Sequence, residues 1–145
     1  MSKKLAITCA TVFLGFIAVS VPTAAHHAFS SEFDSTKPVR LRGTITRMEW
    51  LNPHSWMHVE VKGDDGKSAI WMIEAGPPGA LVRRGWRKDS VKPGVEVLVE
   101  GYRAIDGSTR ANGRDVTLPD GTRLFAGSSG TGAPYDEPKS SDSRK

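Results

Sequence analysis

Apolar and polar residues alternate along much of this chain, and this period of two constrains the fold more than any other feature. Between residues 39 and 46, valine, leucine, glycine and isoleucine at odd positions alternate with arginine and threonine. A strand with one face on a core has this pattern, because successive side chains point to opposite faces. The same alternation returns in residues 56–61 and 95–102, and residues 68–74 follow the turn at 63–66 directly as the hairpin partner of the second run. The sequence therefore predicts a β protein.

The first strand contains a break in phase. Met48 and Trp50 fall on even positions, whereas the apolar residues before Arg47 fall on odd ones. Such a slip would turn the apolar side chains to the wrong face unless the strand contains a β-bulge. The sequence therefore predicts a bulge near Arg47 and a bend in this strand.

One helical segment interrupts the strands. The sequence Pro77-Pro78-Gly79 opens it and Gly85 ends it, which predicts a helix of one or two turns near residues 79–85. After the helix come the strand at 95–102 and two short apolar segments, 116–118 and 123–126, which flank a turn. We expect an all-β fold with one short helix, in the order β-β-β-α-β-β. This order is typical of a five-stranded OB-like barrel.

Residues 1–25 have the layout of a secretory signal peptide. Lys3 and Lys4 precede an apolar run at 5–21, and Pro22 and small residues follow it. We expect cleavage near Ala25, a periplasmic or secreted product and no stable membrane insertion afterwards. An uncleaved membrane anchor is the alternative, because the apolar run is near the minimum length for spanning a bilayer.

Removal of this segment has consequences for chemistry. Cys9 is the only cysteine of the chain, so the mature protein would have no thiol nucleophile, zinc thiolate or disulfide. The net charge of +4 at pH 7 includes Lys3 and Lys4, so the mature chain is closer to neutral. Its charge therefore does not indicate a nucleic-acid partner.

The mature chain divides into three parts. Residues 26–37 form an N-terminal arm that we expect to dock through the rings of Phe29 and Phe33. The barrel domain is expected at 38–126. Residues 127–145 are rich in glycine, serine and proline, and this composition predicts a disordered tail.

Several short motifs resemble those of one protein family. They are HHAFSSEFD from His26, RGTITRMEWLNPHSW from Arg42, ALVRRGW from Ala80, and KPG followed by VEGYRA, which ends at Ala104. The chain resembles a family of small exported bacterial proteins known as a domain of unknown function, from about His26 to Gly127. The resemblance implies an exported barrel domain and implies no activity.

The four histidines are candidate metal ligands: His26, His27, His54 and His58. If His26 is the first mature residue, its amine and ring nitrogen, with one imidazole from elsewhere, form the T-shaped nitrogen set that suits Cu(II). Cleavage one residue earlier would place His27 third, where its ring, the amine and two amides form a square plane. We expect copper as the cofactor, or none. The alternative is that these histidines are structural.

A second set of residues suggests a site without metal. Trp50, Trp56 and Asn52 lie near the start of the second strand, and Arg84 and Trp86 lie in a basic segment after the helix. An aromatic barrel face of this kind would bind a small or anionic ligand. The alternative is that these rings fill the core and the charges are solvated.

Catalytic motifs are lacking. The sequence has no Gly-x-Ser-x-Gly elbow, phosphate-binding loop or His-Glu-x-x-His motif, and no acid/base carboxylate pair. Glu49, Glu60 and Glu74 read as single acids within strands. We therefore expect a binding protein rather than an enzyme.

Overall fold

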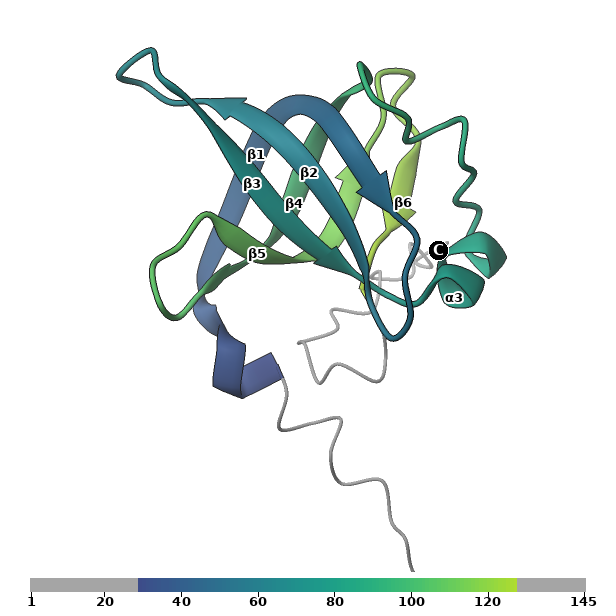
Figure 1. The fold of residues 1–145 in the computed structure, drawn as a ribbon, viewed down its shortest axis with the longest axis horizontal. Helices are drawn as coiled ribbons and strands as arrows, with labels where there is room; N and C mark the ends of the chain where they lie inside the picture. Colours follow the sequence, from purple (N-terminus) through teal and green to yellow (C-terminus); the bar gives the residue numbers. More distant parts are fainter. Residues whose placement is uncertain (1–28, 128–145) are drawn as a thin grey trace, which may run out of the picture.

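The computed structural model describes residues 29–127 (Figure 1). Residues 29–32 are helical. The strands and the helix α3 follow in this order: β1 (Phe33–Glu49), β2 (Ser55–Lys62), β3 (Ser68–Ala75), α3 (Pro78–Arg83), β4 (Glu96–Ala104), β5 (Arg110–Thr117) and β6 (Arg123–Phe125). The predicted signal peptide, His26, His27 and the tail beyond residue 127 lie outside the described residues.

Five strands close into a ring. The sheet order is β3-β2-β1-β4-β5-β6, and an additional pairing of β3 with β5 closes the first five strands on themselves. This closing contact is parallel and pairs residues 72–74 with residues 110–112. The prediction of a mostly β fold with a short helix after the third strand is confirmed, and α3 lies where that helix was expected.

The predicted strand order needs two corrections, because β5 begins earlier than expected and a sixth strand follows it. Residues 110–115 belong to β5, although their polar sequence did not predict a strand. β5 lies between β4 and β3, so its backbone donors and acceptors find partners on both sides. The apolar residues Ala111 and Val116 of β5 are buried and form its contribution to the core. Residues 123–125 form a sixth strand, which pairs only with β5.

The predicted bulge lies between Ile45 and Arg47. It allows one curved strand to pair with β4 through residues 33–44 and with β2 through residues 43–49. Gly43 lies where the two pairings overlap, and a Cβ atom there would be 2.2 Å from the carbonyl oxygen of Glu60. Only glycine allows the two backbones to approach so closely.

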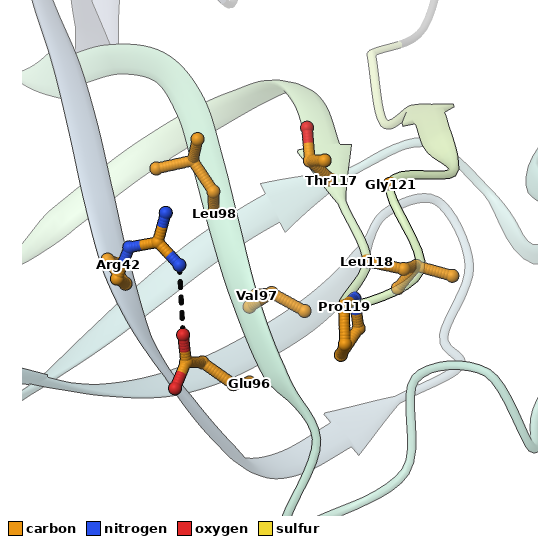
Figure 2. A pocket seen from close by; sticks show the side chains of 8 residues that line it. All are labelled: Arg42, Glu96, Val97, Leu98, Thr117, Leu118, Pro119 and Gly121. Carbon is orange, nitrogen blue, oxygen red and sulfur yellow. Dashed lines mark hydrogen bonds and ion pairs between the residues drawn. The ribbon is translucent and has the colours of Figure 1, made fainter.

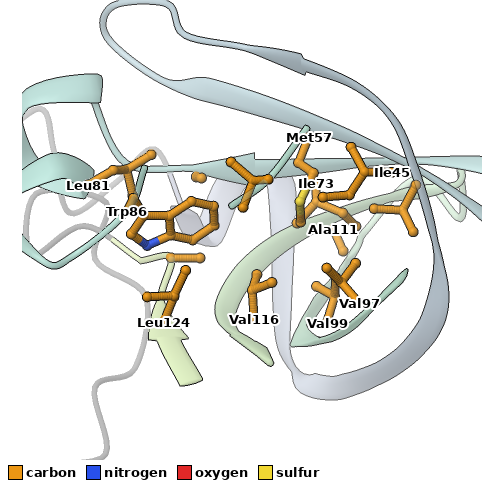
Figure 3. Close-up of a cluster of buried hydrophobic side chains, with 14 residues drawn as sticks. Ile45, Met57, Ile73, Leu81, Trp86, Val97, Val99, Ala111, Val116 and Leu124 are labelled. Atoms are coloured by element: carbon orange, nitrogen blue, oxygen red, sulfur yellow. The ribbon is translucent and has the colours of Figure 1, made fainter. Parts of the chain in front are cut away.

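The ring encloses the main core, and Figure 3 shows its side chains. Trp86 is the largest fully buried side chain, and its Nε1 donates a hydrogen bond to the carbonyl oxygen of Phe125 at 2.9 Å. Leu81 of α3 and Leu124 of β6 belong to the same cluster. The short helix therefore contributes to the core rather than to the surface alone.

The N-terminal arm docks by its rings, as expected. Phe29 and Phe33 are buried with Tyr102 and Ala104 in a second, smaller cluster. The centroid of the Phe29 ring lies 5.9 Å from that of Phe33 and 5.6 Å from that of Tyr102. β1 already begins at Phe33, earlier than the alternating pattern from Val39 indicated, because Phe33 pairs with Ala104.

Within residues 29–127, no helix combines the length and apolar character needed to cross a membrane.

Candidate functional site

One row of paired residues crosses four neighbouring strands of the ring. Trp56 of β2 pairs with Glu74 of β3, and Glu74 pairs with Asn112 of β5. Asn112 pairs in turn with Tyr102 of β4, on which the N-terminal arm packs. Glu74 and Asn112 are buried, with 5% and 2% of their surfaces exposed. The contact between β3 and β5 that closes the ring therefore contains two buried polar side chains.

Glu74 forms a pair with His54. The imidazole Nδ1 lies 2.9 Å from the carboxyl Oε1. This separation places the Nδ1 proton between the two groups and leaves Nε2 as the free nitrogen of the ring. The His54 side chain is 32% exposed, whereas that of Glu74 is 7% exposed. The pair thus joins a partly exposed imidazole to a buried carboxyl.

Burial raises the pKa of the Glu74 carboxyl above its ordinary value. The positive charge of His54 acts against this shift, the negative charge of Glu32 adds to it, and Arg110 and Asn112 oppose it. Desolvation dominates, because a charged carboxylate is costly away from water. By contrast, hydrogen bonds lower the pKa values of Asp34, Asp106 and Asp120 below the ordinary value.

Arg110 connects this pair to the arm. Its Nη2 lies 2.7 Å from Oε2 of Glu32. Its guanidinium carbon also lies 5.7 Å from the centroid of the Trp56 ring and 5.8 Å from that of Phe33. Both distances are within the range of cation–π attraction. One arginine of β5 thus contacts the arm, β1 and β2.

Asn112 carries an unpaired acceptor. Its Oδ1 is buried without a hydrogen-bond partner among the described residues. An unpaired buried amide oxygen costs free energy, so such atoms are uncommon unless water or a ligand satisfies them. The residue that carries this acceptor pairs with Glu74 on one side and with Tyr102, on which the arm packs, on the other side.

His58 has different surroundings from His54. Its Nε2 is 3.1 Å from Nη2 of Arg47 and 3.5 Å from Oε1 of Glu49. Because an arginine can only donate, the Nε2 atom of His58 accepts this hydrogen bond and is not free. These partners lie on β1, whereas the partner of His54 lies on β3, on the other side of β2. The structure therefore does not bring His54 and His58 to a common partner.

No group of three histidine, cysteine, aspartate or glutamate side chains within residues 29–127 could hold a metal ion. His26 and His27 lie outside this part of the chain.

The predicted aromatic and basic residues are dispersed. Trp86 is 1% exposed and lies in the core, so it is not available to a ligand. Trp50 is half-buried against the same core. Arg84 donates to the carbonyl oxygen of Gly127 and lies over the Phe125 ring, and Asn52 is exposed. Only Trp56 lies beside the His54–Glu74 pair.

A hollow of about 190 Å³ lies elsewhere, over β4, and Figure 2 shows its lining. Arg42 is its one cationic side chain, and the Nη1 atom of Arg42 lies 2.9 Å from Oε1 of Glu96. The positive charge of Arg42 is therefore balanced by Glu96 within the lining itself.

Sequence reasoning missed several residues of the site. Glu74 read as an isolated acid in a strand, and Glu32, Arg110 and Asn112 belong to segments without a functional motif. One signal was available for Glu74. The turn at 63–66 fixes the register of the β2–β3 hairpin and so places Glu74 opposite Trp56.

We predict that Glu74→Gln removes a pH dependence of stability. Above about pH 4.3, the ordinary pKa of glutamate, the folded state retains the Glu74 proton more strongly than the unfolded chain does, so wild-type stability falls as the pH rises. Glutamine cannot ionise and can still accept the Nδ1 proton of His54. Urea denaturation at pH 4.5 and pH 8 should show the variant gaining on the order of 1 kcal/mol relative to wild type at the higher pH. An equal difference at both pH values would contradict this prediction.

No curated protein and no solved structure matches the chain. A family described as a family of unknown function matches residues 14–113, which include the arm, His54, Glu74 and Arg110. Since this match covers more than half of the sequence, the chain belongs to that family, DUF6152.

Proposed function

We propose that this protein is an exported binding protein that holds Cu(II) between its mature N-terminus and His54. Signal-peptide cleavage after Ala25 would make His26 the first residue of a periplasmic or secreted chain. The amine and ring nitrogen of His26 would supply two ligands, and Nε2 of His54 would supply the third.

The observation that supports this proposal most is the His54–Glu74 pair. Histidines that bind metals usually donate their second ring N–H to a carboxylate or carbonyl, which fixes the tautomer and the direction of the ring. His54 has this arrangement, with Nδ1 at 2.9 Å from Glu74. His58 does not, because Arg47 occupies its Nε2. His54 is therefore the better third ligand.

The length of chain between the arm and the N-terminus also supports the proposal. Phe29 is fixed in the small aromatic cluster, and it lies only three positions after His26 in the chain. Three residues span at most about 10 Å. Glu32, in the same arm, lies near enough for its charge to act on Glu74. A mature N-terminus at His26 would thus be tethered close to His54.

The donor set favours copper over other metals. It contains an amine and imidazole nitrogens, and Cys9, the only thiol, lies in the proposed signal peptide. Three nitrogens in a plane suit Cu(II), whereas structural zinc prefers four tetrahedral ligands that often include thiolates. His27 would take part only if cleavage occurred one residue earlier.

The ring itself is proposed to be an OB-type barrel. Its closed order is β1-β2-β3-β5-β4. The row of paired residues described above meets β1 at two different positions. At one end of the row Trp56 pairs with Glu49, and at the other end Tyr102 pairs with Pro38. Strands that close with such a stagger are tilted, as barrel geometry requires.

The test compares two histidine variants. His54→Ala should weaken Cu(II) binding by at least about tenfold, since loss of a residue that merely supports a metal ligand already costs 10- to 100-fold. His58→Ala, the matched control four residues further along the chain, should leave the affinity within about twofold. Both variants are purified from the periplasm, where intact mass must show loss of residues 1–25. Equal effects of the two substitutions would refute the proposed ligand.

A non-metal interaction module is the second candidate. It is favoured by Trp56, whose half-buried ring lies under Arg110 beside His54. A small ligand on this face would change the fluorescence of Trp56 without any metal. It becomes the better interpretation if the mature protein fails to bind Cu(II) and its fluorescence responds to small anions, with Trp56→Phe abolishing the response.

A further inference from the structure

The connection between α3 and β4 carries the charge excess of the whole chain. Residues 83–92, which we call the basic connection, contain five cations and one acid: Arg83, Arg84, Arg87, Lys88, Lys92 and Asp89. Their formal charges give this segment a net charge of +4, which equals the net charge of the full sequence. The charges of all other residues therefore balance, and the positive excess is concentrated in one short segment.

The cations of the basic connection have no carboxylate within 4.0 Å among residues 29–127. Arg84 binds only the carbonyl oxygen of Gly127 and the face of the Phe125 ring, so its charge is not neutralised. Elsewhere in this part of the chain, Lys62 and Arg103 also have no such partner. The remaining lysines and arginines are paired with carboxylates: Lys37, Arg40, Arg42, Arg47, Lys67, Arg110, Arg114 and Arg123. A local concentration of unpaired charge attracts a partner of the opposite sign.

Three buried anchors hold the basic connection against the ring. Leu81, Trp86 and Val91 are at most 1% exposed and recur every five residues. Trp86 also donates a hydrogen bond to the carbonyl oxygen of Phe125. Figure 1 shows the connection along the outer edge of the ring. Four of its five cations are exposed: Arg83, Arg87, Lys88 and Lys92. The backbone that carries these charges is therefore fixed before any partner binds.

An exposed apolar side chain lies beside these charges. Val82, the residue before Arg83, is 59% exposed, the largest value for a large hydrophobic residue among residues 29–127. Trp86, the single aromatic residue of the basic connection, is buried and cannot stack on a nucleic-acid base. The cores of protein–protein interfaces are depleted in lysine. Exposed cations around a valine suit the surface of an anionic membrane, where charges meet phosphates and apolar groups enter the acyl boundary.

We propose that the basic connection binds the surface of an anionic membrane. Its four exposed cations contact the headgroup phosphates, and Val82 contacts the boundary between headgroups and acyl chains. Binding falls as salt is added, because salt screens exposed charges. The inference concerns a different surface from the copper site and does not rest on the proposed function.

The experiment measures partition of the purified protein onto vesicles by sedimentation. The vesicles contain phosphatidylcholine alone or with about one-third phosphatidylglycerol. The ratio of the two partition coefficients reports charge-dependent binding, because the apolar run at residues 5–21, where it is still attached, binds both kinds of vesicle. The test variant replaces Arg83, Arg87, Lys88 and Lys92 with glutamine. The control variant replaces four other exposed cations with glutamine: Lys37, Arg40, Lys62 and Lys67.

The wild type should prefer the anionic vesicles by at least about 100-fold, because each lysine or arginine near such a surface contributes about fivefold. The test variant should lose most of this preference, and the control variant, which removes the same charge, should retain it within about threefold. Equal losses in the two variants would overturn the proposal, because net charge alone would then explain the binding. A wild type without the preference would also overturn it, as would one that binds polyglutamate but not vesicles.

A second pair of variants tests the apolar contact. Val82→Ser should weaken binding to the anionic vesicles by about threefold, because part of a valine side chain leaves water at the membrane boundary. Ile105→Ser is the control, since Ile105 is 52% exposed and lies directly after β4. It should leave binding unchanged. Equal effects of the two serine variants would contradict the place of Val82 in the contact.

Discussion

Trp86→Ala is expected to lower the free energy of unfolding by about 3–5 kcal/mol. The ring of Trp86 is 1% exposed, and it fills the end of the core formed by α3 and β6 with Leu81 and Leu124. Alanine would leave a cavity there and would also leave the carbonyl oxygen of Phe125 without its donor. Such a loss is a large fraction of the stability of a domain of this size.

Chemical denaturation with an unchanged m-value would measure this loss. Trp71→Ala is the matched control, because Trp71 is only half-buried and lies under Arg103. We expect the control to cost less than half as much. Equal losses of unfolding free energy in the two variants would contradict the prediction that Trp86 contributes more to the core than Trp71 does.

Extension of the mature N-terminus by three glycines is expected to weaken Cu(II) binding by at least about 100-fold, the upper end of the cost of losing a residue that only supports a metal ligand. The extension moves the amine away from His26 and replaces it with an amide, so two of the three proposed nitrogens no longer chelate together. Three glycines are needed for a clear result. One or two would place His27 or His26 third, and a third-position histidine forms its own square-planar copper site.

The electron paramagnetic resonance spectrum should change together with the affinity, since it reports the nitrogens bound to copper. A tail extension by three glycines after Lys145 serves as the control and should change neither. If the N-terminal extension leaves both affinity and spectrum as in the unextended protein, the N-terminal amine is not a ligand.

The sequence predicted the elements that alternate strongly and those that proline and glycine delimit. The bulge before Arg47, the β2–β3 hairpin and α3 all follow from local patterns. Docking of the arm followed from two phenylalanines in a polar segment. Each of these signals lies within about 15 residues of chain.

The polar part of β5 could not be predicted in this way. Residues 110–115 form a strand because β3 and β4, distant in sequence, supply its hydrogen-bond partners. The site depends on the same long-range contact. Glu74 is buried among residues from the arm, β2 and β5, so its raised pKa is a property of the assembled ring and not of the strand that carries it.

The parallel contact that closes the ring is short, and it involves only residues 72–74 and 110–112. The hairpin of β2 and β3 already carries Trp56 and Glu74, and His54 directly precedes it, whereas Arg110 and Asn112 arrive only with β5. A chain whose ring is open therefore exposes Glu74 to water, and its carboxyl titrates with an ordinary pKa. Loss of the raised pKa of Glu74 would therefore report opening of the contact between β3 and β5.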